Sequence, residues 1–245
     1  MTEKLSDEFT KRFHDVEENY KVIQERMAEA AVKSGRNPKD ITLLAATKTV
    51  PVEVINHGIS IGIDHIGENR VQELTDKYDR YDLNACDLQF IGHLQTNKVK
   101  YLIGKVSMIQ SVDSVKLAKE ISRLSTAAGS VMDILVEVNI GREENKSGVF
   151  PEGLEDLLGE ISQMQGIRVR GLMSIPPVDA EMAETMRYFS NMSKYFVDIK
   201  AKKLDNVCMD YLSMGMSHDY YEAILSGANL VRVGSALFGA RIYSK

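Results

Sequence analysis

The chain has 245 residues, of which 44% are hydrophobic and 27% are charged. This length suffices for one large domain with a buried core and is typical of an α/β barrel. The formal net charge is −5, with lysine and arginine dispersed among acidic residues, which argues against a nucleic-acid-binding surface. The two cysteines, Cys86 and Cys208, have no CxxC partner. They indicate a reducing compartment rather than a metal cluster or a disulfide framework.

The N-terminal segment is charged and lacks the apolar core of a signal peptide. No apolar run approaches the roughly 20 residues that a membrane span requires. We therefore expect a cytoplasmic protein that binds neither membranes nor nucleic acid. Residues 1–40 are predicted to form one helix and a lead-in, with Ser6 as the N-cap and an end near Gly35.

From residue 41 onward, short β-rich apolar runs alternate with amphipathic stretches of helical spacing. Eight runs have the character of strands: 41–48, 64–69, 88–95, 106–113, 133–140, 167–175, 207–214 and 229–239. The helix-like stretches between them are 52–62, 71–78, 97–104, 114–129, 150–164, 180–203 and 219–228. Such alternation implies βαβ crossovers, and eight units favour a closed barrel over an open doubly wound sheet. We predict a single (β/α)8 TIM barrel over residues 41–239, with an extra N-terminal helix and no second β domain.

A lysine stands where barrel enzymes carry their chemistry, at the C-terminal end of a strand. Lys48 ends the first run, and side-chain alternation places it on the same strand face as Leu44 and Ala46. If this face points into the barrel, the amine lies at the mouth, where it could condense with an aldehyde. A solvated lysine at a strand end is the alternative.

Two turns rich in glycine and serine follow the last two strand-like runs. Ser213, Gly215 and Ser217 lie in the sequence SMGMS, where Ser217 is the expected N-cap of the next helix. Gly234 and Ser235 open a short helical stretch after the final run. Backbone N–H groups at these two positions of a barrel commonly bind phosphate, so we predict a phosphate site; ordinary turn chemistry is the alternative.

Two further polar residues are expected at the mouth. Arg232 alternates with Leu230 and Gly234, so it faces the same way as the predicted phosphate site. A buried guanidinium needs an acceptor, which could be a carboxylate such as Asp210 or a heterocyclic nitrogen of a ligand. Asn69 ends the second run, where its amide could bind a ligand oxygen or cap the next helix.

Other polar residues end the third and fifth runs and could line the cavity as a hydrogen-bonded ring: His93, Gln95, Glu137 and Asn139. The five histidines of the chain show no metal-ligand spacing such as HExxH. The sequence therefore predicts no metal site.

Long strings along the chain resemble the YggS/PROSC family of pyridoxal-phosphate-binding proteins, also called pyridoxal phosphate homeostasis proteins. Between residues 41 and 239 they are LLAATKTV, IGENRVQEL, FIGHLQTNKVK, IQSVDS, VEVNIGREENKSG, GLMSI, LSMGMSHDYYEAI and VRVGSALFG. This family is similar to the barrel domain of alanine racemases. The resemblance implies the pyridoxal 5′-phosphate (PLP) fold type III, with Lys48 holding PLP as a Schiff base.

The resemblance also implies roles for the remaining candidate residues. Arg232 would lie opposite the pyridine nitrogen, Asn69 near the ring hydroxyl and Met214 near the ring. The residues that would hold the phosphate come from the two turns, and they are Ser213, Ser217, Gly234 and Ser235.

Catalysis is disfavoured by the same set of residues. Arginine stays protonated, so Arg232 beside the ring nitrogen would disfavour a pyridinium and weaken the ring as an electron sink. Racemisation requires a second acid/base group, which alanine racemases take from a tyrosine of a C-terminal domain. This chain ends soon after the last run, and none of Tyr220, Tyr221 and Tyr243 is placed by the pattern to replace that tyrosine.

We therefore predict a monomeric carrier that holds PLP within the cell and either buffers it or delivers it, with apo forms of PLP-dependent enzymes as candidate recipients. One alternative is a slow PLP-dependent enzyme of the amino-acid racemase type. Another is a cofactor-free, aldolase-like barrel in which Lys48 attacks a sugar carbonyl.

Overall fold

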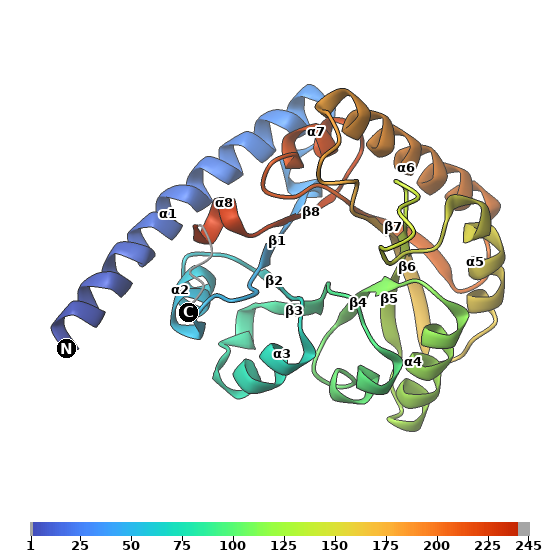
Figure 1. The fold of residues 1–245 in the computed structure, drawn as a ribbon, viewed down its shortest axis with the longest axis horizontal. Coiled ribbons are helices and arrows are strands. Elements are labelled where there is room, and N and C mark those ends of the chain that lie inside the picture. The colour runs from blue at the N-terminus through green and yellow to red at the C-terminus, as the bar shows by residue number, and fades with distance from the viewer. Residues whose placement is uncertain (1, 240–245) are drawn as a thin grey trace.

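A computed structural model describes the backbone of residues 2–239 and the side chains of residues 9–239. Eight parallel strands close into a barrel in sequential order, and the last pairs with the first (Figure 1). The strands are β1 (Thr42–Ala46), β2 (His65–Glu68), β3 (Asp87–Phe90), β4 (Met108–Val112), β5 (Met132–Val138), β6 (Ile167–Ser174), β7 (Val207–Ser213) and β8 (Leu230–Val233). Each lies within, or overlaps, a run predicted as a strand, so the predicted (β/α)8 barrel is confirmed.

Helices surround the barrel and connect successive strands (Figure 1). The α-helices are α2 (Val52–Ser60), α3 (Val71–Lys77), α4 (Val115–Ala127), α5 (Leu154–Ser162), α6 (Met182–Lys202), α7 (Tyr220–Leu225) and α8 (Ser235–Phe238). The short 3-10 helices are η1 (Pro38–Asp40), η2 (Tyr78–Arg80), η3 (Leu83–Ala85), η4 (Thr96–Tyr101) and η5 (Pro151–Gly153).

The connection between β3 and β4 differs from the expected amphipathic helix. Its helical element is η4, a 3-10 helix. Val99 and Leu102 are both fully buried and lie three residues apart. Because a 3-10 helix has three residues per turn, this spacing places both side chains on one face, against the core.

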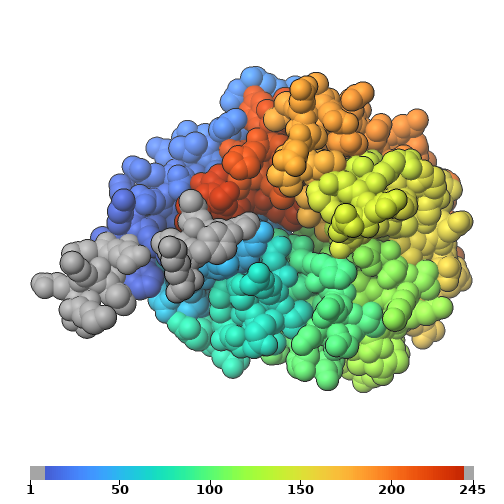
Figure 2. Space-filling view, viewed as in Figure 1, coloured from blue at the N-terminus to red at the C-terminus, as the bar shows by residue number. Residues whose placement is uncertain are grey.

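The N-terminal helix α1 (Thr2–Lys33) runs along the outside of the barrel, against α2, α7 and α8 (Figures 1 and 2). Asn19 fastens it to α8, because its Nδ2 donates to the carbonyl of Leu237 at 3.0 Å. The helix already includes Thr2, so the prediction of Ser6 as its N-cap is wrong; the residues before Ser6 carry no apolar periodicity that could mark the start. Among the described helices, none is long and apolar enough to cross a membrane.

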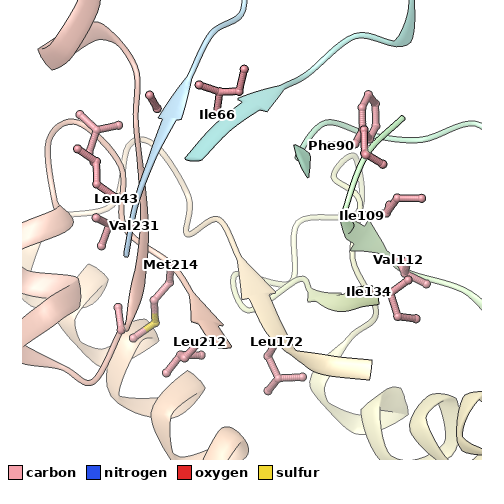
Figure 3. Packing of buried hydrophobic residues seen from close by; sticks show 14 of the residues in the cluster. Leu43, Ile66, Phe90, Ile109, Val112, Ile134, Leu172, Leu212, Met214 and Val231 are labelled. Carbon is pink, nitrogen blue, oxygen red and sulfur yellow. The ribbon is translucent and has the colours of Figure 1, made fainter. Parts of the chain in front are cut away.

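Side chains on the outer side of the strands form the main core between the barrel and its helices. Figure 3 shows members of this layer, including Leu43, Ile66, Phe90 and Leu172. Residues of opposite parity point inward and form two smaller clusters, which are Leu44–Ile91–Leu230 and Met108–Leu135–Met173. Part of the barrel interior is therefore filled by apolar side chains, as in other barrels of this type.

Candidate functional site

The strand face that carries Leu44 and Ala46 points into the barrel, which meets the condition set for Lys48 above. Leu44 is fully buried in an interior cluster with Ile91 and Leu230, and Ala46 packs against it. β1 ends at Ala46, and Lys48 follows in a turn, half-buried, at the mouth of the barrel. The amine is thus carried by a turn at the C-terminal end of β1 rather than by the strand itself.

β8 brings the second glycine–serine turn next to the first strand. Leu44 pairs with Arg232 in the parallel ladder between β1 and β8. Two residues further along, a Cβ atom on Gly234 would lie 3.2 Å from the carbonyl oxygen of Ala46. Glycine allows this close approach, so the turn that opens α8 and the turn that carries Lys48 are neighbours at the mouth.

Ser217 reaches across to the start of α8. Its Oγ accepts the backbone N–H groups of Gly234 and Ala236, both at 3.2 Å. The prediction that Ser217 caps the next helix is therefore wrong, since Asp219 occupies the N-cap position of α7. These two backbone donors converge on the Ser217 oxygen, and the Ser217 hydroxyl can itself donate to an anion beside exposed Ser235.

Ser213 and Met214 occupy different surroundings from that corner. Ser213 is fully buried inside the barrel, where its Oγ accepts a hydrogen bond from Arg232 at 2.5 Å. Met214 is also fully buried, but its side chain packs in the outer core beside Leu212 and Val231 (Figure 3). The structure thus brings Ser217, Gly234 and Ser235 together at one corner, and it places Ser213 with the guanidinium instead.

Arg232 is held inside the barrel by neutral acceptors. In addition to Ser213, its Nη2 donates to the backbone carbonyl of Ser174 at 3.0 Å. Asp210, considered above as its acceptor, instead binds Arg170 at 2.7 Å. Burial lowers the pKa of Arg232 to about 10, opposed by the charges of Glu137 and Asp219. The guanidinium therefore remains protonated near neutral pH, as expected from the sequence.

A chain of hydrogen bonds continues from Arg232 across the barrel, and sequence reasoning missed it. Ser213 Oγ donates to Gln110 Oε1 at 2.7 Å, and Gln110 Nε2 donates to Gln89 Oε1 at 2.6 Å. Gln89 Nε2 then donates to the carboxylate of Asp87 at 2.8 Å. Glutamines in the middle of otherwise apolar strands were the available signal. In each of these hydrogen bonds the donor lies on the side of Arg232 and the acceptor on the side of Asp87. The Ser213 hydroxyl therefore gives its hydrogen to Gln110 and turns its oxygen toward Arg232.

Glu137, on β5, lies near the guanidinium of Arg232 and has a shifted pKa. Burial, together with the charge of Asp113, raises its pKa to about 7 against the opposing charge of Arg232. Its position inside the mouth agrees with the predicted polar ring. Asn139 instead organises the loop after β5, because its amide bonds to the backbone of Glu143 through N–H and carbonyl groups at 3.0 and 2.8 Å.

His93 contacts the loop after β5 rather than the interior. It is exposed, and its Nδ1 lies 2.8 Å from Ser147 Oγ. A surface cavity of about 440 Å³ between the loops after β3 and β4 is lined in part by His93, Gln95 and Lys116. Within the described part of the chain, no group of three or more potential ligand side chains could hold a metal ion.

Asn69 follows β2 at the mouth and has unused hydrogen-bonding capacity. Its Oδ1 is buried without a hydrogen-bond partner. Its backbone is tightly packed, since a Cβ atom on Gly92 would lie 2.0 Å from the Asn69 carbonyl oxygen. A buried polar atom of this kind usually has a partner, so the side chain is a candidate ligand contact.

The tyrosines considered for acid/base chemistry lie elsewhere. Tyr220 is buried in the outer core. Tyr221 is bonded through its hydroxyl to Glu29 and Lys33 on α1, both at 3.0 Å. Tyr243 lies outside the described residues. Neither described tyrosine therefore points its hydroxyl into the barrel mouth.

Comparison with known proteins gives the family. The sequence model of the alanine racemase N-terminal domain matches residues 14–242. The pyridoxal phosphate homeostasis protein of Aquifex aeolicus is 42% identical over 90% of this chain and 96% of its own length. The Escherichia coli K12 protein of the same name is 33% identical over 95% and 99%. This chain belongs to the pyridoxal phosphate homeostasis protein family.

Solved structures agree with this family and with the fold. An unknown protein from Bifidobacterium adolescentis is 34% identical, covers 92% of this chain and 95% of its own, and superposes with a TM-score of 0.87. PipY of Synechococcus elongatus with PLP bound is 32% identical, with a TM-score of 0.76 over 89% of this chain and 100% of its own. Alanine racemase from Corynebacterium glutamicum, 15% identical with a TM-score of 0.68 over 93% of this chain and 62% of its own, shares the fold.

Proposed function

We propose that this protein binds PLP at the barrel mouth, with the amine of Lys48 attached covalently to its aldehyde, and that it serves PLP homeostasis. The observation that carries the proposal is the proximity of the Gly234 turn to Ala46, the last residue of β1 before the turn that carries Lys48. PipY, a relative of the same fold, binds PLP, and curated relatives are named for PLP homeostasis. These relatives support the choice of cofactor.

The residues of the mouth fit PLP on chemical grounds. Its phosphate needs hydrogen-bond donors, and the hydroxyls of Ser217 and exposed Ser235 can supply them at the corner where the N–H groups of Gly234 and Ala236 bind Ser217. Its ring hydroxyl needs a polar partner, and the unpartnered Oδ1 of Asn69 offers one. Arg232 is the proposed partner of the pyridine nitrogen, because it is a fixed cationic donor on the neighbouring strand face. Ser213 then acts on the ligand through Arg232.

The aldehyde of PLP condenses reversibly with amines, and that chemistry serves both storage and release. Arg232 remains a donor near neutral pH, because its pKa of about 10 lies well above that range. It would therefore disfavour protonation of the ring nitrogen, which carbanion chemistry requires. These properties support a carrier that buffers PLP over an enzyme with rapid turnover.

We further propose that apo forms of PLP-dependent enzymes receive the cofactor, and that the carrier is a cytoplasmic monomer. Light scattering after size-exclusion chromatography tests the monomeric state. Transfer is tested by mixing the loaded protein with an apo-enzyme and following recovery of the enzyme's activity. Recovery faster than with an equal concentration of free PLP supports delivery, whereas equal rates would restrict the role to buffering.

Binding itself is tested by titrating the purified apo-protein with PLP and recording its visible absorbance. We expect a saturable new band with a stoichiometry of one and the loss of that band in Lys48→Ala. Glu120→Ala, which alters only a surface ion pair with Arg123 on α4, is the matched control and should titrate like the wild type. A band of equal amplitude in Lys48→Ala would refute the proposed attachment.

A further inference from the structure

The turn that carries Lys48 contains a strained residue. Thr49 has a φ of +64°, in the left-handed region that β-branched residues avoid. It directly follows Lys48. A conformation of this kind persists only where the surroundings impose it, and such residues concentrate at functional sites.

Side chains and backbone of β2 and α3 impose this conformation from both sides of Lys48. On one side, the backbone N–H and the hydroxyl of Thr47 both donate to the carbonyl of Gly67, at 2.9 and 3.1 Å. On the other side, the N–H of Thr49 donates to Glu73 Oε2 at 2.9 Å. The two residues that flank Lys48 are thus fastened to the neighbouring strand and helix.

Lys77 connects these attachments into one network. Its Nζ lies 3.3 Å from Glu73 Oε2, 2.9 Å from Glu68 Oε1 and 3.4 Å from the carbonyl oxygen of Thr47. Tyr81 donates to the same Glu68 oxygen at 2.8 Å. The Glu68 side chain is completely buried and that of Lys77 is 15% exposed, so these charges are little screened by water.

We propose that Glu73 and Lys77 are positioning residues for the Lys48 amine, and this inference rests on the proposed function. Fastening α3 to β2 requires only the bond between Lys77 and Glu68. The additional bonds end on the backbone of Thr47 and Thr49, on either side of the reactive residue. They hold the turn in the strained conformation that keeps the amine at the mouth, and a displacement of about 1 Å can slow a reaction on the order of 100-fold.

Two reagents of different kinds test this role in Glu73→Ala. Acetic anhydride reports the general accessibility of Lys48 in the apo-protein, measured by peptide mass spectrometry relative to Lys194, an exposed lysine on α6. PLP reports directed reaction at the mouth, measured by stopped-flow absorbance. Because the half-buried amine would leave the mouth for solvent, we expect acetylation of Lys48 to rise at least threefold and its reaction with PLP to slow at least tenfold.

The opposite directions separate positioning from simple loosening, which would raise both rates. Unchanged rates, or two rates that rise together, would overturn the inference. If the wild type does not react with PLP, the proposed function fails, and acetylation alone then decides the positioning role, with an unchanged labelling of Lys48 overturning it. Glu120→Ala on α4 is again the control and should leave both rates unchanged.

Two further variants keep the test informative if Glu73→Ala folds poorly. Glu73→Gln retains an oxygen that can accept from Thr49 N–H, so we expect both rates within about threefold of wild type. Thr49→Gly adopts a positive φ without strain. In the Glu73→Ala background it should therefore restore at least half of the lost PLP rate on a logarithmic scale. A failure of Thr49→Gly to restore any of that rate would show that Glu73 does not act through the turn.

Discussion

The two ends of the barrel both carry polar side chains, but they organise them differently. At the N-terminal ends of β5 and β6, Asp133 receives two hydrogen bonds from Arg168, at 2.8 and 3.0 Å, and one from Arg170 at 2.6 Å. Arg170 also binds Asp210. Each of these charges has an opposite charge as its partner. The charged groups at this end therefore neutralise one another, as is typical of a network that stabilises the fold.

At the mouth, the groups proposed to contact the ligand lack a hydrogen-bonded partner of opposite charge. Arg232 is bound only by neutral oxygens among the hydrogen bonds of the described residues, and the Oδ1 of Asn69 is buried without a partner. Burial outweighs the nearby charge of Arg232 and raises the pKa of Glu137. Unused hydrogen-bonding capacity at the C-terminal face marks the end that receives a ligand. The comparison predicts that mouth variants change ligand affinity, whereas variants at the opposite end change stability.

The largest effect is expected for Arg232→Met. Loss of a charge-assisted hydrogen bond to the ligand should weaken PLP binding about 100-fold, or about 2.7 kcal/mol. Equilibrium titration of the apo-protein measures this change. Arg170→Met is the matched control from the other end, and we expect its affinity to stay within about twofold of wild type. Equal losses of affinity in the two variants would break the comparison.

Glu137 gives a pH-dependent effect on stability. Its pKa is raised to about 7, so the folded protein holds a proton that the unfolded chain releases near pH 4.3. The resulting stabilisation is complete below about pH 4.3 and is lost as the pH rises through about 7. Between pH 5 and pH 7.5, the unfolding free energy of the wild type should fall by about 2 kcal/mol more than that of Glu137→Gln. Urea denaturation at several pH values measures both curves, and parallel curves would contradict the assignment.

Ser217→Ala should act on the phosphate alone. Removing its hydroxyl from the corner should weaken PLP binding about tenfold, close to 1.4 kcal/mol. Pyridoxal, which lacks the phosphate, provides the control ligand, and its affinity should not change. If both ligands were weakened equally, Ser217 would support the fold of the corner rather than bind the phosphate.

The smallest effect concerns the opposite end. Asp133→Asn removes the charge shared by Arg168 and Arg170, and these side chains are partly exposed. We expect the free energy of unfolding to fall by about 1 kcal/mol and the affinity for PLP to stay unchanged. Urea denaturation and PLP titration of the same preparation measure the two quantities. A clear loss of affinity would show that this end also acts on the ligand.

The barrel could be predicted because each strand carries its own apolar run between polar turns. That Leu44 and Ala46 share a face also followed from strand alternation, and the structure shows that this face points inward. Pairings between distant segments could not be predicted. Ser217 has a local interpretation as the cap of the next helix, but its partners lie on the turn after β8, 17 and 19 residues away. The local preference of serine for a helix N-cap conflicts there with the contacts to the turn after β8, and these tertiary contacts determine where the side chain binds.

The surroundings of Arg232 show the same limit. The positive charge of Arg232 suggested a carboxylate as its hydrogen-bond acceptor, and Asp210 on the preceding strand was the candidate. Asp210 is instead half-exposed and paired with Arg170, while Ser213 and the carbonyl of Ser174 accept from Arg232. Strand alternation gives only the face of a side chain. The height of each residue in the barrel depends on the register between strands, which the sequence of one strand does not specify.

The central claim is that PLP becomes attached at the mouth through one amine. Reduction of the loaded protein with borohydride makes such a bond permanent, and peptide mapping by mass spectrometry then locates the pyridoxyl group. We predict that the group lies on the peptide containing Lys48 and that this modified peptide disappears in Lys48→Ala. A pyridoxyl group found mainly on another lysine, with Lys48 unmodified, would contradict the account.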